Sequence, residues 1–214
     1  MFKKYLLPIC SIVLVTGLAL DLFAPVKRDF KLFDPVTVGR LDAAMWRSYY
    51  EKKPIKLFFQ LGSLVHQQFQ APRFRSYMIA YYSAKAAFIF KNGHERADYE
   101  KALPYLVAYY QQLESISKTH FNFRLLAKTE LEWWIIRREG EIHTPEDWKI
   151  LLGQEAEIMY SIPANRFGTY AEQRVRAMLI RDGKGQTINE DDWKQIEKLC
   201  IEAWTSFHDA VKVL

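Results

Sequence analysis

Residues 122–140 read NFRLLAKTELEWWIIRREG, and this stretch decides how the rest of the chain is interpreted. It begins at an Asn, ends at a Gly and carries apolar residues on nearly every side, which predicts a buried central helix. Five residues share its most apolar face at the i, i+3, i+4, i+7 spacing of a helix: Phe123, Leu126, Glu130, Trp134 and Arg137. A carboxylate and a guanidinium one turn either side of Trp134 make Glu130 and Arg137 the first candidates for a buried polar site.

Size and composition predict a globular chain with a sizeable core. The chain has 214 residues, of which 50% are hydrophobic and 15% aromatic, and only eight Pro and nine Gly. Its 30 basic and 25 acidic residues are interspersed, without a block of five or more like charges. A nucleic-acid footprint needs clustered positive charge or a recognition motif, so a mixed solvated surface and no nucleic-acid partner are predicted.

The N-terminal segment has two interpretations. From Tyr5 to Ala24, 15 of 20 residues are apolar and only Asp21 is charged, enough for one helix across a bilayer. A cleaved signal peptide is the alternative, because Gly17-Leu18-Ala19 offers small residues at the −3 and −1 positions. We favour an uncleaved signal-anchor over residues 1–26, followed by a basic linker over 27–34 and a single all-α domain over 35–214.

The positive charges on the two sides of the apolar run are nearly equal in number, so they give little preference for either orientation of this anchor. Lys3 and Lys4 precede the apolar run, and Lys27, Arg28 and Lys31 follow it. The signal-like layout favours the N-terminus inside and the domain outside the cytoplasm. Residues 5–24 then make the membrane a partner, whereas signal cleavage would give a secreted soluble helical protein.

After the anchor, the chain predicts helix after helix and no strand. Prolines and capping residues mark the starts, including Asp34-Pro35, Pro54, Pro72 and Thr144-Pro145. The expected segments are 35–53, 54–69, 72–92, 95–117 with a break at Pro104, 122–140, 145–162, 169–181, and 189 onward. Short connections favour a bundle of about seven or eight helices. In the 169–181 helix, Val175, Met178 and Leu179 are expected to point inward and the three arginines mostly outward.

Recognisable catalytic and metal motifs are absent from the sequence. None of the five His follows a Glu or Asp by three, as a di-iron bundle requires. Gly183-Lys184-Gly185 is not a phosphate-binding loop, and no nucleophile motif occurs. Cys200 shares a face with Ile196 and Leu199, which predicts a buried apolar residue rather than a reactive thiol. No cofactor or metal is therefore predicted.

Aromatic doublets are the remaining feature: Tyr49-Tyr50, Tyr81-Tyr82, Tyr109-Tyr110 and Trp133-Trp134. Neighbours on a helix point about 100° apart, so one ring of each doublet reaches the core and the other its flank. Tyrosine hydroxyls, Glu130 and Arg137 could then line a polar pocket, with these ligand-contacting candidates: Trp133, Trp134, Tyr49, Tyr50, Tyr81 and Tyr109. In a purely structural interpretation the rings fill space, and Glu130 and Arg137 pair with Arg174 or Glu172.

Two functions follow from these patterns. The first is a membrane-tethered helical module that binds a partner protein or an amphipathic ligand through its aromatic-rich face. The second is an enzyme, with Glu130 as acid or base and Arg137 holding an anionic substrate. A concave pocket around a Glu130 of shifted pKa would favour the enzyme.

Overall fold

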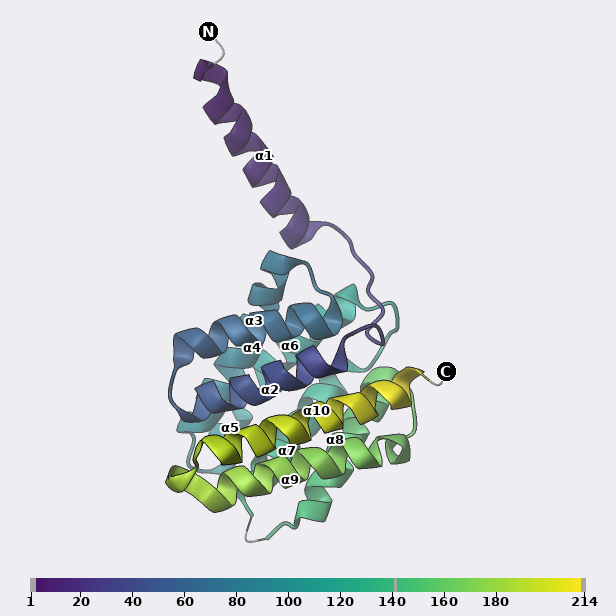
Figure 1. Ribbon diagram of the computed structural model, residues 1–214. Helices are drawn as coiled ribbons and strands as arrows, with labels where there is room; N and C mark the ends of the chain where they lie inside the picture. Colours follow the sequence, from purple (N-terminus) through teal and green to yellow (C-terminus); the bar gives the residue numbers. More distant parts are fainter. Residues whose placement is uncertain (1–2, 141, 213–214) are drawn as a thin grey trace.

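The computed structural model describes residues 3–140 and 142–212, with side chains from residue 12 onward (Figure 1). In these ranges the regular structure is helical, which confirms the predicted all-α class and helical bundle. The α-helices are α1 (Lys3–Phe23), α2 (Pro35–Tyr50), α3 (Pro54–Phe69), α4 (Arg73–Asn92), α5 (Arg96–Glu100), α6 (Leu103–Ile116), α7 (Phe123–Arg138), α8 (Pro145–Tyr160), α9 (Gly168–Lys184) and α10 (Glu190–Lys212). Two short 3₁₀ turns, Ala164–Phe167 and Gly185–Thr187, flank α9.

The helix starts are set by local capping chemistry. Asp34 accepts a hydrogen bond from the Thr37 backbone N–H at 3.0 Å, and Pro35 occupies the first turn of α2. Thr144 and Asp147 form a reciprocal capping box at the start of α8, with Thr144 N donating to Asp147 at 2.7 Å. Because these signals are local, the sequence places the helix starts closely.

The helix ends differ from the expected ones where the backbone turns. The first helix of the bundle stops at Tyr50 rather than Lys53, since Lys52 takes a positive φ of 56° and Pro54 restarts the chain as α3. The segment expected over 95–117 is two helices, α5 and α6, divided before Pro104. In the described residues after the anchor segment, this division gives nine α-helices, α2 to α10, where about seven or eight were expected.

The buried apolar side chains form two clusters, and α7 contributes to both. One cluster gathers residues of α2, α8, α9 and α10, and the other gathers residues of α3, α4, α6 and α7. On α7, Ile136 belongs to the first cluster, whereas Leu131 and Ile135 belong to the second. The helix quoted above therefore lies between the two parts of the core.

Helices α2 and α10 lie side by side (Figure 1), and a glycine allows their close approach. A Cβ atom at Gly39 would lie 2.6 Å from the Ile201 Cα atom of α10. Any side chain at this position would therefore force the two helices apart.

Helix α1 extends away from the bundle, and its base is fixed to α4 (Figure 1). Asp21 accepts hydrogen bonds from the backbone N–H groups of Phe74 and Arg75 at 2.8 and 3.0 Å. Arg75 also donates to the Ala24 carbonyl at 2.7 Å. Asp21 thus caps the first turn of α4, although it comes from another helix.

The basic linker expected over 27–34 lies against the bundle. Phe30 and Phe33 are buried, and Arg28 exchanges backbone hydrogen bonds with Ile116 and Lys118 at 2.6 and 2.8 Å. These contacts hold the chain between α1 and α2 in a defined path.

The membrane anchor expected over residues 5–24 falls partly outside the described side chains, which begin at residue 12. Within the described residues, none of the helices combines the length and hydropathy needed to cross a bilayer.

Candidate functional site

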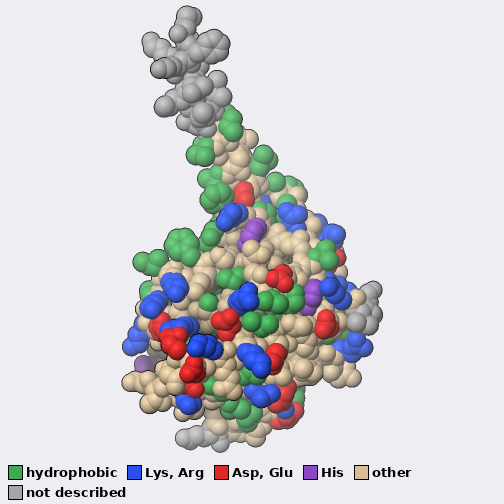
Figure 2. All heavy atoms as spheres, viewed as in Figure 1, with side chains coloured by type: hydrophobic (Ala, Val, Ile, Leu, Met, Phe, Trp, Pro, Cys, Tyr) green, Lys and Arg blue, Asp and Glu red, His purple; other side chains and the backbone are tan. Residues whose placement is uncertain are grey.

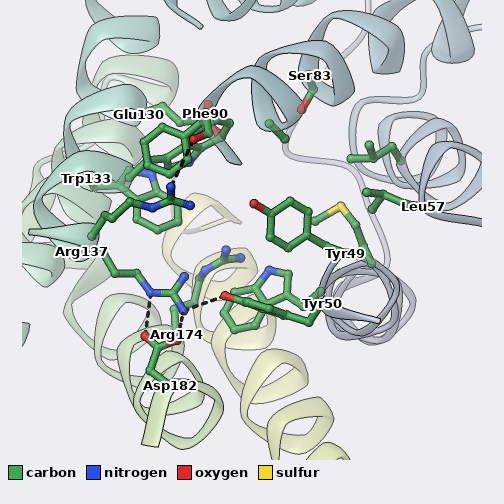
Figure 3. Close-up of a pocket in the computed structure, with 16 residues that line it drawn as sticks. Tyr49, Tyr50, Leu57, Ser83, Phe90, Glu130, Trp133, Arg137, Arg174 and Asp182 are labelled. Atoms are coloured by element: carbon green, nitrogen blue, oxygen red, sulfur yellow. Dashed lines mark hydrogen bonds and ion pairs between the residues drawn. The ribbon is translucent and has the colours of Figure 1, made fainter. Parts of the chain in front are cut away.

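A pocket of about 440 Å³ opens between α2, α3, α4, α7 and α9 (Figure 3). Its size falls within the roughly 300–1,000 Å³ range of small-molecule sites. Apolar side chains form most of its wall: Met45, Trp46, Leu57, Leu61, Ala87, Phe90, Trp133 and Trp134. Polar groups share the lining: Tyr49, Tyr50, Ser83, Glu130, Arg137, Arg138, Arg174 and Asp182. An apolar chamber with a few converging charges is the usual form of a ligand site.

Arg137 is held at one side of the pocket by two partners (Figure 3). Its Nε and Nη2 atoms donate to the Asp182 carboxylate at 3.0 and 2.8 Å. Nη2 also donates to the Tyr50 hydroxyl at 3.0 Å. This bidentate pairing fixes the guanidinium plane, so its remaining edge is presented in a defined direction.

Glu130 accepts a hydrogen bond from the Tyr110 hydroxyl and lines the same pocket. Burial raises the pKa of its carboxyl group to about 7, although the Tyr110 hydrogen bond and the charge of Arg174 act in the opposite direction. The carboxyl therefore exchanges its proton near neutral pH, the range in which an acid–base group is most effective.

Glu155 of α8 is a second buried carboxyl group near Glu130, and its buried Oε1 atom has no hydrogen-bond partner. Burial and the neighbouring Glu130 charge raise the pKa of Glu155 well above its usual range, against smaller opposing effects of Arg174 and Trp133. Glu155 therefore favours its neutral, protonated form beside Glu130.

Arg174 of α9 places its guanidinium group in a buried polar contact. It forms an ion pair with Asp42, and the Trp204 indole N–H donates to the same Asp42 oxygen at 2.8 Å. Its guanidinium lies 5.2 Å from the Trp46 ring centroid and 5.7 Å from that of Tyr170. The arginines of this helix were expected to point mostly outward; Arg174 is an exception, because Asp42 and the surrounding rings compensate its burial. Leu179, which was expected inside, is 44% exposed.

The structure brings together most of the residues singled out in the sequence. Six of them line the pocket: Glu130, Arg137, Trp133, Trp134, Tyr49 and Tyr50. The structural interpretation expected Glu130 and Arg137 to pair with Arg174 or Glu172, but Glu130 accepts a hydrogen bond from Tyr110 and Arg137 pairs with Asp182. Glu172 instead bonds Lys149 at 2.9 Å on the surface.

Two tyrosines of the candidate set lie elsewhere. Tyr81 is 52% exposed and lines a separate shallow hollow on α3 and α4. Tyr109 packs against the Tyr110 ring with a centroid distance of 4.9 Å and is not part of the pocket lining. Burial raises the pKa of the Tyr109 hydroxyl. Both rings follow the doublet pattern, which fixes the angle between neighbours but not which cavity each reaches.

Several pocket residues were not among the site residues predicted from the sequence: Trp46, Ser83, Phe90, Arg138, Arg174 and Asp182. Asp182 and Arg174 reach the pocket from α9, which follows α7 by 30 residues. The sequence contains a sign of the buried Asp42–Arg174 pair, because each charge interrupts an apolar helix stripe. Asp42 lies one turn from Val38 and Trp46, and Arg174 lies one turn from Tyr170 and Met178. A charge inside an apolar helix stripe marks a buried polar contact.

Cys200 is fully buried as expected, and burial raises the pKa of its thiol. Among the described side chains, those of residues 12–140 and 142–212, no three His, Cys, Asp or Glu come close enough together to hold a metal ion.

Comparison with protein-family models, with curated proteins and with solved structures finds no match to this chain. The site is therefore interpreted from its own chemistry.

Proposed function

We propose that this chain is a membrane-tethered helical protein whose pocket binds a small amphipathic ligand with an anionic head group. The observation that carries the proposal is one chamber in which aromatic walls and arginines meet. The apolar part of a ligand would pack on Trp133, Trp134 and Phe90, and its head group would face Arg137.

The charges near the pocket favour an anion. Three arginines line it, Arg137, Arg138 and Arg174, and the nearby Asp182 and Asp42 neutralise two of them. Glu130 and Glu155 add negative charge only when ionised, and burial raises the pKa of both. Below about pH 7 the site thus carries a positive excess, which attracts a carboxylate or sulfonate.

The full chain in nanodiscs can be tested with 2-naphthoate, a soluble aromatic anion, by saturation-transfer NMR. Saturation transfer to 2-naphthoate is expected, with little transfer to the cationic 2-naphthylmethylamine. Ala87→Trp fills the pocket from α4 and should abolish the naphthoate signal.

Leu179→Trp is the matched control, because it adds an indole at an exposed site outside the pocket. If Ala87→Trp lowers the unfolding midpoint, Ser83→Phe serves as a second pocket-filling variant. Naphthoate binding that survives in a folded pocket-filling variant would contradict the proposal.

A second candidate function is acid–base catalysis in the same pocket. The observation that favours it is a carboxyl group of pKa about 7 at the wall of a small-molecule chamber. Glu130 in its ionised form could take a proton from water as that water attacks an ester carbonyl.

Hydrolysis of 2-naphthyl acetate measures this activity. The rate should rise as the pH passes through about 7, where Glu130 loses its proton, and Glu130→Gln should lose the pocket-dependent rate. Equal hydrolysis by the Gln variant would exclude Glu130 as the base while leaving ligand binding intact.

The tether is proposed to be residues 5–24, in a single pass with the helical domain outside the cytoplasm. Support comes from the apolar run and from the exposed apolar side chains on α1, such as Leu14, which is 75% exposed. A C-terminal reporter active only outside the cytoplasm tests the orientation, and mass spectrometry of the mature N-terminus tests cleavage. A new N-terminus near Leu20 would replace the tether by a secreted soluble protein, and an inactive reporter would reverse the orientation.

A further inference from the structure

The basic excess of the chain is concentrated in one helix pair. Residues 52–94 contain seven Lys or Arg and no Asp or Glu, which leaves 23 basic and 25 acidic residues in the remainder. The segment contains α3 and α4. Outside residues 52–94, basic and acidic residues are interspersed. The mixed surface expected for the whole chain therefore does not extend to α3 and α4.

The same two helices carry most of the exposed large apolar side chains of the bundle. After the linker, nine such side chains are exposed in the described residues, and five belong to α3 or α4: Ile55, Phe59, Phe74, Met78 and Tyr81. We call these five the α3–α4 outer face. Phe74, Met78 and Tyr81 follow i, i+4, i+7 spacing and form one stripe of α4.

Aromatic contacts join the two helices across this face. The Tyr77 ring lies between them, with centroid distances of 6.0 Å to Phe58 and 5.8 Å to Phe59. A shallow hollow lies beside these rings, lined by Phe58, Tyr77, Met78, Tyr81 and Tyr82. Lys56, Arg73 and Lys85 are exposed on the same helices.

This face lies next to the base of α1. Asp21 bonds the backbone of Phe74, the first residue of the exposed stripe, so the apolar surface of α1 continues directly onto α4. In Figure 1, α3 and α4 lie in the part of the bundle nearest α1, whereas α9 lies on the far side. Figure 2 shows hydrophobic side chains gathered on the shoulder of the body below α1.

We propose that the α3–α4 outer face rests on a bilayer surface that contains anionic lipid. Its aromatic and aliphatic side chains would lie at the level of the head groups, and Lys56, Arg73 and Lys85 would contact lipid phosphates. The inference depends on the proposed tether, since α1 brings this face to the membrane.

A lipid surface suits this face better than a nucleic acid or a second copy of the chain. Nucleic-acid grooves are lined by basic and polar groups, whereas Ile55 and Phe74 here are 74% and 54% exposed without a polar function. A second copy would bring its own basic residues against these, and α3 and α4 hold no carboxylate to pair with them.

Depth measurements on the full chain in nanodiscs test the proposal. Single cysteines are introduced in a Cys10→Ser background, where the buried Cys200 does not react, and labelled with an NBD fluorophore. The nanodiscs contain equal parts of phosphatidylcholine and phosphatidylserine, with a doxyl-labelled lipid as quencher. Labels at Phe74→Cys and Met78→Cys should be quenched and shifted to the blue, with Ile55→Cys as a substitute if either fails to fold.

Matched controls come from the far side of the bundle and from α1. Ile150→Cys and Leu179→Cys are of similar exposure, at 51% and 44%, and should remain unquenched. Leu18→Cys reports the tether itself. Lys56→Glu combined with Lys85→Glu, or nanodiscs of phosphatidylcholine alone, should reduce quenching at Phe74→Cys and leave that at Leu18→Cys unchanged.

The outcomes separate the inference from the tether. Quenching at Leu18→Cys without quenching at Phe74→Cys and Met78→Cys would overturn the inference and leave the tether standing. Absence of quenching at all three would overturn both. A blue shift that appears without lipid when the protein dimerises would assign the face to a second copy of the chain. A blue shift on addition of a duplex oligonucleotide in place of lipid would assign it to nucleic acid. Either result would overturn the inference.

Discussion

Two arginine–carboxylate pairs adjoin the pocket, and they differ in how completely the protein closes them. The Arg174–Asp42 pair is enclosed, with side chains 9% and 3% exposed and Trp46, Tyr170 and Trp204 around the guanidinium. The Arg137–Asp182 pair is more open, at 17% and 42%.

The difference shows how one type of ion pair can serve two purposes. Water and ligands have little access to the enclosed pair, so its removal affects mainly the folded state. The open pair is partly screened by solvent and contributes little to stability, but its guanidinium borders the pocket. Stability and ligand binding should therefore separate between the two pairs.

Breaking the enclosed pair should have the largest effect. Asp42→Ala leaves Arg174 charged and buried, and the free energy of unfolding should fall by about 3–5 kcal/mol. Urea unfolding of the full chain, followed by tryptophan fluorescence, measures the loss. The double variant Asp42→Leu/Arg174→Met is the control, because it removes both charges and should recover most of the stability. A loss below about 1 kcal/mol for Asp42→Ala, the value of an exposed pair, would show that this site is open to water.

Glu130 should give a smaller effect that depends on pH. Its pKa is raised from 4.5 to about 7 in the folded chain, so the unfolded chain binds fewer protons between these values and stability falls as the pH rises. Glu130→Gln removes this dependence and should be more stable than the parent at pH 8 by roughly 2–3 kcal/mol, with little difference at pH 4. Urea unfolding at the two pH values measures it, and a gap of equal size at both would contradict the assignment.

The same titration should govern ligand affinity. 2-Naphthoate should bind more weakly as the pH rises through about 7, because ionised Glu130 repels its carboxylate. The Gln variant should bind with a flatter pH profile.

The open pair should show the smallest effect on stability. Arg137→Gln is expected to change the free energy of unfolding by no more than about 1 kcal/mol, since Asp182 is partly exposed. The affinity of the Arg137→Gln variant for 2-naphthoate should nevertheless fall about tenfold, because it loses a charge-assisted hydrogen bond of roughly 1.5 kcal/mol or more. Calorimetry of the full chain in nanodiscs measures the affinity, and Arg166→Gln, an exposed arginine outside the pocket, is the control. Equal affinity in both variants would remove Arg137 from the binding site.

The contrast also explains which features could be predicted from sequence. Helix starts depend on neighbours three residues apart, as at Asp34 and Thr37, so they were placed closely. Glu130 and Arg137 were found because both lie on one helix face. The Asp42–Arg174 pair joins residues 132 positions apart, and the packing of both α2 and α9 against α10 brings them together.

The charge distribution gives a second example of what a local pattern misses. The absence of consecutive like charges was taken to indicate a mixed surface, but the segregation spans 43 residues and consists of missing acids. A window of five residues does not detect it, whereas the paired helices α3 and α4 display it on one side of the bundle.

Helix α4 has a mechanical consequence for the whole molecule. Its 20 residues form a rod about 30 Å long. Asp21 fixes the first turn of this rod to α1, and Ser83, Ala87 and Phe90 form part of the pocket wall near its other end. Under the proposed tether, a tilt of α1 would move α4 like a lever against the chamber, and ligand binding would then depend on the thickness of the bilayer.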